Sequence, residues 1–247
     1  VYLDLGDPTD RYFTNISWSP DGKSIYLIEV NRDQNHAKLC QYDAQKGNLL
    51  KVLFEEQHPK YVEPQKPITF LPWDSGKFIY QSQKDGFNHP YLYDISGKEL
   101  KQVTSGNWLV KDIIGFDAKR KEIIIASTEY SPLQTNLFKV NVASGKRTPV
   151  GNNTGVHSGN LSHSSKYLID SWSSPDTPRT IQIVDTQKNK NIVTLLTAED
   201  PFKDYLMPGI ETGTIKAADG VTDLYYRITK PADFDATKKY PVIVYVY

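Results

Sequence analysis

The sequence has little sulfur, no net charge and no long apolar run. Its 247 residues include one cysteine, Cys40, so an internal disulfide or a multi-cysteine metal site is excluded and a buried structural thiol is expected. Lysine plus arginine equals aspartate plus glutamate, 29 each, so no net field attracts nucleic acid or anionic lipid. No stretch approaches the roughly 20 apolar residues of a membrane span, and the first residues show no signal peptide. The sequence itself therefore does not encode a compartment.

Patterns for metals and nucleotides are also missing. No G-x-x-x-x-G-K or G-x-G-x-x-G string occurs, and the histidines form no i, i+4 pair. Phosphate-binding loops and zinc sites need such spacings. We therefore predict no metal site and no cofactor. The five histidines are His36, His58, His89, His157 and His163.

What the chain does contain is a repeat of short strands. Each unit begins with a lysine and an apolar strand, followed by a polar hairpin, an alternating second strand, a Gly or Asn turn and a third strand. A period near 45 residues with one turn motif per unit predicts the blades of an all-β propeller. Tandem β-sandwiches are the alternative for regularly spaced strands. The four opening lysines are Lys23, Lys77, Lys121 and Lys166.

The fourth strand of each blade is expected from the linking segments, such as residues 108–116. A Pro and Gly turn at Trp18-Ser-Pro-Asp-Gly22 opens the first unit, with echoes at residues 70–76 and 116–119. We expect its aromatic residue to pack between sheets.

The period ends near Tyr205. Residues 211–217 and 224–228 flank Asp219-Gly220, which predicts a hairpin. The chain then stops at Tyr247 inside the apolar run 240–247, which predicts a buried strand that needs further neighbours. We expect propeller blades over residues 1–205, the first strands of a second, truncated domain over 206–247, and a larger parent protein.

Several segments together resemble the dipeptidyl peptidase IV type enzymes of the prolyl oligopeptidase family of serine peptidases. The most specific is the stretch from Asp85-Gly-Phe-Asn-His89 to Trp108, coupled to the terminal strand after Lys239-Tyr-Pro241. The others are Trp18 to Gly22, Tyr61-Val-Glu-Pro64, Phe78 to Ser82 and Tyr225-Tyr-Arg227.

This resemblance implies the second half of an eight-bladed propeller, followed by the first strands of an α/β-hydrolase domain. It implies an enzyme that removes N-terminal dipeptides from peptides after proline or alanine, in which the propeller gates and positions the peptide. A periplasmic or secreted location and a homodimer are also implied. The alternatives are a tripeptidyl or acylaminoacyl peptidase of the same family, or a non-enzymatic propeller that binds proteins.

Amide hydrolysis by this route needs a serine on a strand-to-helix elbow, a histidine and an aspartate. The nearest string, Gly155-Val-His-Ser-Gly159, has histidine at the serine position, and we expect a loop turn there. The resemblance implies that all three triad residues lie downstream, so this segment alone should be inactive. It also implies that Tyr247 contributes its hydroxyl to the oxyanion hole.

Two further acidic segments are candidates for substrate binding. The Glu55-Glu56 pair could bind a peptide amine, but we expect a solvated turn, because the family's acidic pair lies upstream. Val62 and Glu63 align with a propeller loop that carries an aromatic residue and an arginine near the substrate in mammalian-type enzymes. The resemblance therefore implies a substrate-lining location for Val62 and Glu63, without the same chemistry.

Overall fold

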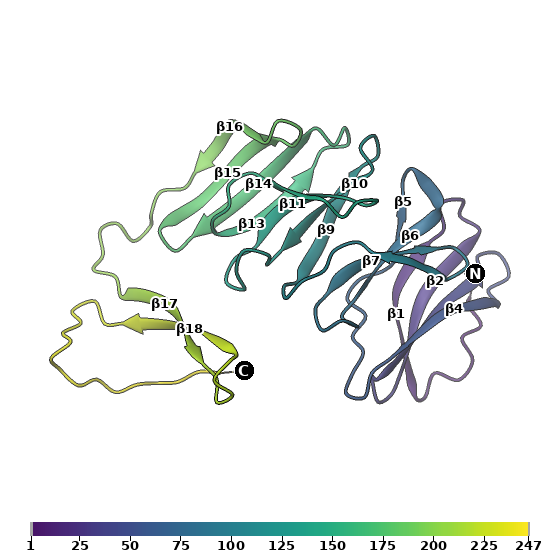
Figure 1. The fold of residues 1–247 in the computed structure, drawn as a ribbon, viewed down its shortest axis with the longest axis horizontal. Coiled ribbons are helices and arrows are strands. Elements are labelled where there is room, and N and C mark those ends of the chain that lie inside the picture. The colour runs from purple at the N-terminus through teal and green to yellow at the C-terminus, as the bar shows by residue number, and fades with distance from the viewer. Residues whose placement is uncertain (1, 247) are drawn as a thin grey trace.

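The computed structural model describes residues 2–246, which form antiparallel sheets without a helix (Figure 1). The first sheet contains β1 (Arg11–Trp18), β2 (Ser24–Asn31), β3 (His36–Asp43) and β4 (Leu49–Gln57). The second contains β5 (Thr69–Leu71), β6 (Asp74–Ser82), β7 (His89–Asp94) and β8 (Glu99–Gln102). The third contains β9 (Val110–Asp117), β10 (Glu122–Ser127), β11 (Asn136–Asn141) and β12 (Arg147–Val150). The fourth contains β13 (Val156–Leu161), β14 (Tyr167–Ser174), β15 (Thr177–Asp185) and β16 (Lys190–Thr197).

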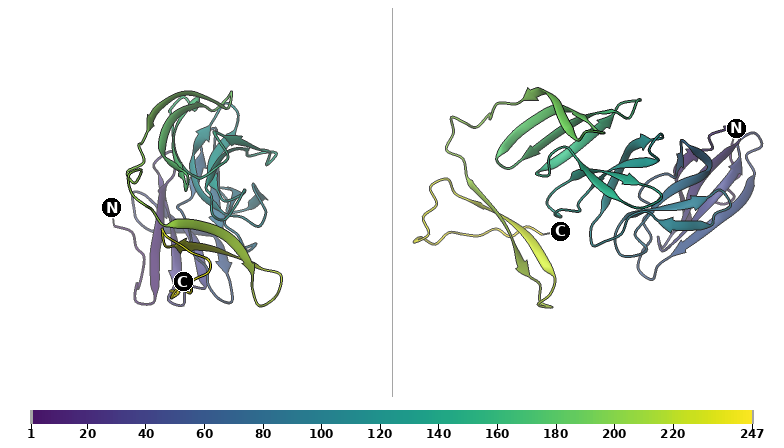
Figure 2. Two further views of the ribbon diagram at one scale, coloured as in Figure 1. Left: turned by 90° about the vertical axis from the view of Figure 1, so that its left-hand side faces the viewer. Right: turned by 45° about the horizontal axis from the view of Figure 1, so that its top comes forward.

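Each sheet is a four-stranded meander in chain order, which confirms the predicted propeller blades. The predicted apolar strands after the four lysines are the second strands, and the linking segments supply the first strand of each following blade. The four blades lie side by side in an arc, with the chain passing from one to the next (Figure 2).

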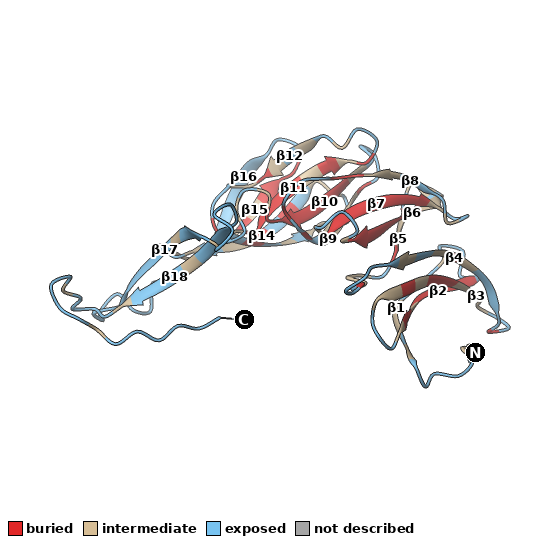
Figure 3. Cartoon of the chain, turned by 60° about the horizontal axis from the view of Figure 1, so that its bottom comes forward, coloured by how far each residue is buried: buried red, intermediate tan, exposed pale blue. Residues whose placement is uncertain are grey.

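Apolar packing between consecutive sheets holds the blades together. One cluster joins the first blade to the second and includes Tyr26, Ile28 and Phe78. A second cluster joins the second and third blades through residues such as Ile79 and Ile123. A third joins the third and fourth through residues such as Ile124, Leu137 and Leu168. The middle strands are therefore the most deeply buried parts of the molecule (Figure 3).

The aromatic residues of the turn motif follow this packing only in part. Phe70 packs edge-on against Tyr26, and Phe116 packs against Trp73. Trp18, in contrast, is 58% exposed. The expectation that this aromatic packs between sheets is correct for the two echoes and wrong for Trp18. Phe70 and Phe116 lie on faces that pack against the preceding blade. Trp18 lies opposite Ile25 on the outer face of the first blade, which no other sheet of the described residues covers.

The outer faces of the two end blades differ. Leu3 and Leu5, before β1, pack on a cluster that contains Leu27, Cys40 and Tyr42. Cys40 is a free thiol and only 2% exposed, which confirms the buried thiol. Burial raises its pKa to about 11.

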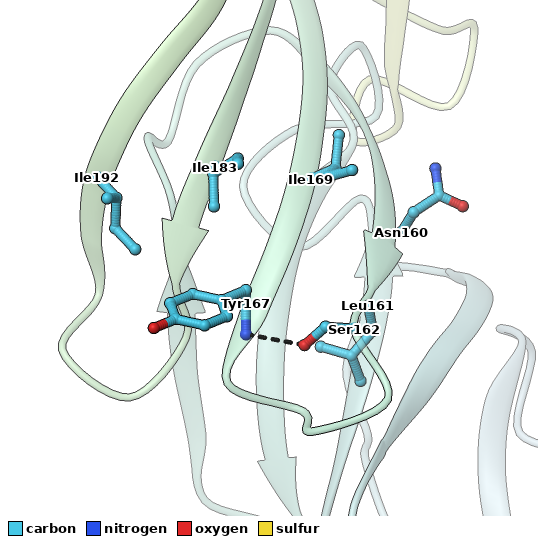
Figure 4. Close-up of a pocket in the computed structure, with 7 residues that line it drawn as sticks. All are labelled: Asn160, Leu161, Ser162, Tyr167, Ile169, Ile183 and Ile192. Atoms are coloured by element: carbon cyan, nitrogen blue, oxygen red, sulfur yellow. Dashed lines mark hydrogen bonds between the residues drawn. The ribbon is translucent and has the colours of Figure 1, made fainter.

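On the last blade, a largely apolar hollow of about 480 Å³ opens on the outer face. Figure 4 shows Ile169, Ile183 and Ile192 on neighbouring strands of this face, beside Tyr167. The backbone N–H of Tyr167 donates to the Ser162 hydroxyl over 3.1 Å.

Beyond the blades, β17 (Gly209–Lys216) and β18 (Asp223–Lys230) form the predicted hairpin, which stands apart from the four sheets (Figure 1). The predicted terminal strand is not observed, because residues 241–246 are extended but belong to no sheet, and most of their side chains are exposed. A strand exists only where a neighbouring strand accepts its backbone hydrogen bonds. Tyr247 lies outside the described residues.

One glycine shows how closely adjacent blades approach. Gly97, in the turn between β7 and β8, has a φ of +92°, and a Cβ there would lie 2.4 Å from the carbonyl oxygen of Leu53 in β4. Gly86 has a similar φ of +101°, but a Cβ there would meet nothing within 4 Å. Both glycines have a left-handed backbone conformation that disfavours other residues. Only at Gly97 would a side chain also collide with the neighbouring blade.

We predict that Gly97→Ala destabilises the intact protein more than Gly86→Ala. Both variants place a side chain in the left-handed region, but only Gly97→Ala forces the first two blades apart, at a further cost of about 1–3 kcal/mol. Urea unfolding followed by tryptophan fluorescence measures both free energies of unfolding. Equal losses in the two variants would contradict the close packing of these blades at Gly97.

Candidate functional site

The connection between the first two blades carries the predicted substrate-lining residues. Strand direction alternates within each blade, so the hairpin between β2 and β3 and the link after β4 lie at the same edge of the blade. The corresponding link after β16 leads to β17. We call this side of the blades the exit edge and the connection over residues 58–66 the exit-edge segment.

Four polar contacts fix the exit-edge segment on three different elements. The backbone N–H groups of His58 and Val62 donate to the carbonyls of Asn35 and Gln34, in the hairpin between β2 and β3, over 3.0 and 2.8 Å. The other two contacts involve first strands: Asn15 Nδ2 of β1 donates to Pro64 O over 3.0 Å, and Lys66 Nζ lies 3.3 Å from Asp112 Oδ1 of β9.

These contacts place the segment across the inner side of the arc. First strands of neighbouring blades approach each other, as β9 and β13 do, and the segment runs from the outer strand β4 toward the first strands. Asn15 has a φ of +56° and lies at a bulge in β1. A bulge re-aims a side chain, and here the amide is aimed at Pro64.

The two predicted residues occupy different environments. Val62 is only 6% exposed and belongs to the cluster between the first and second blades, whereas Glu63 is exposed. Tyr61, just before them, is 55% exposed. Val62 therefore anchors the segment, and the surface it offers to solvent carries the phenol of Tyr61 and the carboxylate of Glu63.

A polar hollow of about 560 Å³ adjoins the segment and is lined by Asn31, Asn35, His36, Gln57, His58 and Pro59. Within it, His36 Nε2 lies 2.6 Å from Glu55 Oε2. His58 Nδ1 accepts the backbone N–H groups of Lys60 and Tyr61 over 3.2 and 3.3 Å. The imidazole of His58 thus shapes the turn that presents Tyr61.

The Glu55-Glu56 pair does not form a double carboxylate site. Adjacent residues of a strand point to opposite faces, and both glutamates lie in β4 and not in the expected turn. Glu55 pairs with His36, while the Glu56 carboxylate accepts the Ser82 hydroxyl over 2.8 Å. Burial and the nearby Glu56 carboxylate raise the pKa of the Tyr80 phenol well above its usual value.

The string around His157 is not a catalytic elbow. The predicted loop turn is wrong, because Val156 to Leu161 pair with β14 as the first strand of the last blade. His157 Nδ1 lies 2.9 Å from Asp170 Oδ1, and Nε2–H donates to Thr154 O over 3.0 Å. Both side chains are at most 1% exposed. This histidine is therefore saturated and inaccessible to a substrate.

Residues 2–246 contain neither a metal-binding cluster nor a membrane-spanning helix. No group of three or more histidine, cysteine, aspartate or glutamate side chains is arranged to hold a metal ion. No helix within this range is long and apolar enough to cross a membrane.

The sequence alone does not indicate which residues fix the exit-edge segment. Asn15 and Lys66 act on partners 49 and 46 positions away, and no local pattern reports such tertiary contacts. The one available signal was the asparagine at position 15 within a strand, since asparagine adopts left-handed φ values more readily than most residues.

Comparison with known proteins places the chain among peptidase propellers. The family described as "Dipeptidyl peptidase IV (DPP IV) N-terminal region" matches residues 1–179. The chain is 25% identical to a probable dipeptidyl peptidase 4 of Aspergillus flavus, over 99% of this chain and 33% of that protein. It is 24% identical to the dipeptidyl peptidase 4 of Trichophyton equinum, over 96% of this chain and 32% of that protein.

Two solved structures share the fold. A putative dipeptidyl aminopeptidase IV from Bacteroides ovatus is 56% identical and superposes with a TM-score of 0.92, covering 100% of this chain and 38% of that one. Porphyromonas gingivalis dipeptidyl peptidase 4 is 28% identical with a TM-score of 0.84, covering 97% of this chain and 34% of that one. The chain thus spans about a third of the length of the curated relatives it matches.

We predict that Val62→Ala in the intact protein speeds tryptic cleavage after Lys60 by about tenfold or more. Removing two buried methyl groups weakens the anchor by at least 1–2 kcal/mol, and local opening controls access of the protease. Mass spectrometry follows this one cleavage, with Glu63→Ala as the control because Glu63 is exposed. Equal rates in both variants would contradict the anchoring role of Val62.

Proposed function

Because the chain belongs to the dipeptidyl peptidase IV N-terminal region family, we propose that the intact protein is a serine-type dipeptidyl peptidase. The proposed reaction removes dipeptides from the N-terminus of peptides after proline or alanine. In this proposal the four blades gate and position the peptide, and the catalytic serine, aspartate and histidine lie outside this chain.

The proposal rests on the exit-edge segment, which is anchored and exposes polar groups, and on the similarity of the chain to dipeptidyl peptidases. The segment is fixed on three elements and presents a phenol and a carboxylate, Tyr61 and Glu63, on the edge from which the chain leaves for β17. An anchored loop with exposed polar groups suits the binding of an extended peptide.

Two roles follow for named residues. Tyr247 would donate its hydroxyl to the oxyanion of the tetrahedral intermediate. Glu63 would attract the cationic N-terminal end of the peptide, while Val62 holds the segment in place from the core. We also propose a periplasmic or secreted location and a homodimer, both from the family resemblance.

The proposal predicts that the intact protein releases the dye from a Gly-Pro chromogenic substrate, and that Tyr247→Phe lowers kcat/KM by about tenfold or more. Tyr245→Phe is the control, since it makes the same chemical change two residues away. Equal activity of both variants would exclude the oxyanion role.

The same assay separates the alternative functions. Activity on an unblocked tripeptidyl substrate but not on the Gly-Pro substrate would favour a tripeptidyl peptidase, and activity on an N-acetylated amino acid substrate would favour an acylaminoacyl peptidase. No activity on any of the three would favour a non-enzymatic propeller that binds proteins.

Glu63 has a separate test. We predict that Glu63→Arg raises KM for a dipeptidyl substrate about threefold to tenfold at low salt with little change in kcat, because an exposed charge acts at a distance that salt screens. Lys46→Glu changes the charge by the same magnitude with the opposite sign, at the opposite edge of the first blade, and should leave KM unchanged. A KM effect of Glu63→Arg that persists at 1 M salt would contradict the electrostatic role.

A further inference from the structure

The interface between the second and third blades contains buried polar atoms without hydrogen-bond partners among the described residues. They are both polar atoms of the Asn136 amide, Ser127 Oγ and Asn88 Oδ1. Asn136, Ser127 and Asn88 are 1%, 0% and 6% exposed. A buried polar group without a partner costs about 1–3 kcal/mol, so four such atoms together require an explanation.

The sheet register brings these groups to one place. Ser127 of β10 is directly opposite both Asn136 of β11 and Val110 of β9. Residues opposite one another in antiparallel strands share a face, and Val110 faces the second blade within the cluster between the second and third blades.

Asn88 comes from the other side of the interface. Its Nδ2 donates to Val110 O over 2.6 Å and to Gln81 Oε1 over 3.1 Å. The two donor hydrogens are thereby used, and Oδ1 of the same amide has no partner among the described residues.

The chemistry of these atoms selects the ligand. All three side chains are uncharged. The set combines two donor groups, the Asn136 Nδ2 amide and the Ser127 hydroxyl, with three oxygens that can accept. The N–H group would repel a cation, and the carbonyl oxygens would repel an anion. A neutral molecule that both accepts and donates hydrogen bonds fits the set, and the near-complete burial restricts it to one enclosed during folding. Water has these properties and typically makes about three hydrogen bonds when buried.

We propose that Asn88, Ser127 and Asn136 form a site for an ordered water that joins the second and third blades. The water accepts from Asn136 Nδ2 and donates to oxygens of the opposing side chains.

The direct test is a crystal structure of the intact protein at about 1.8 Å or better. The expected result is a density peak within hydrogen-bond distance of Asn136 and of at least one of Ser127 Oγ and Asn88 Oδ1. A direct hydrogen bond between Asn136 and Ser127, with no solvent peak, would overturn the proposal.

Thermal unfolding of Asn136→Leu gives a second test. If water satisfies the amide, the leucine removes its hydrogen bonds and lowers Tm by about 2–4 °C or more. If the amide is unsatisfied, a leucine of similar shape leaves Tm unchanged or raises it, which would also overturn the proposal. Asn160→Leu, at an exposed position of β13, corrects for the higher strand propensity of leucine.

Discussion

The packing of each sheet against the next is the constraint on which the rest of the structure depends. Residues Ile123 to Ala126 of β10 alternate between two interfaces, so a single strand serves the clusters on both sides. Burial of each of the three isoleucine side chains in this run contributes about 1.5–3 kcal/mol. Face-to-face stacking obliges the chain to return from the fourth strand of one blade to the first strand of the next, and this return places the exit-edge segment on the inner side of the arc.

The sequence predicted strands best where both faces of the sheet are buried. The second strands contain continuous apolar runs between turns, such as residues 25–28 and 123–126. Such runs are typical of strands covered on both sides. The first strands were seen only as links. The register of three of them, β1, β5 and β9, is interrupted by a bulge or irregularity, as between Thr14 and Ser17 in β1. A bulge breaks the alternation on which a strand prediction depends.

The site was less predictable than the fold. The resemblance singled out Val62 and Glu63 as a prediction. It did not indicate the burial of Val62, which depends on a blade that begins several residues later. The predicted loop at Gly155 to Gly159 was wrong because small and polar residues there are paired by β14. The predicted terminal strand has no neighbouring strand among the described residues, and an apolar sequence alone does not supply one.

The meander within each blade also bears on how the protein is made. Every strand pairs only with strands adjacent in the sequence, so the backbone hydrogen bonds of a blade close loops of a few tens of residues or fewer, and short loops close at low entropic cost. A blade can therefore complete its own hydrogen bonding while the ribosome is still adding the next one. Docking between blades then proceeds from the N-terminal side, one interface at a time.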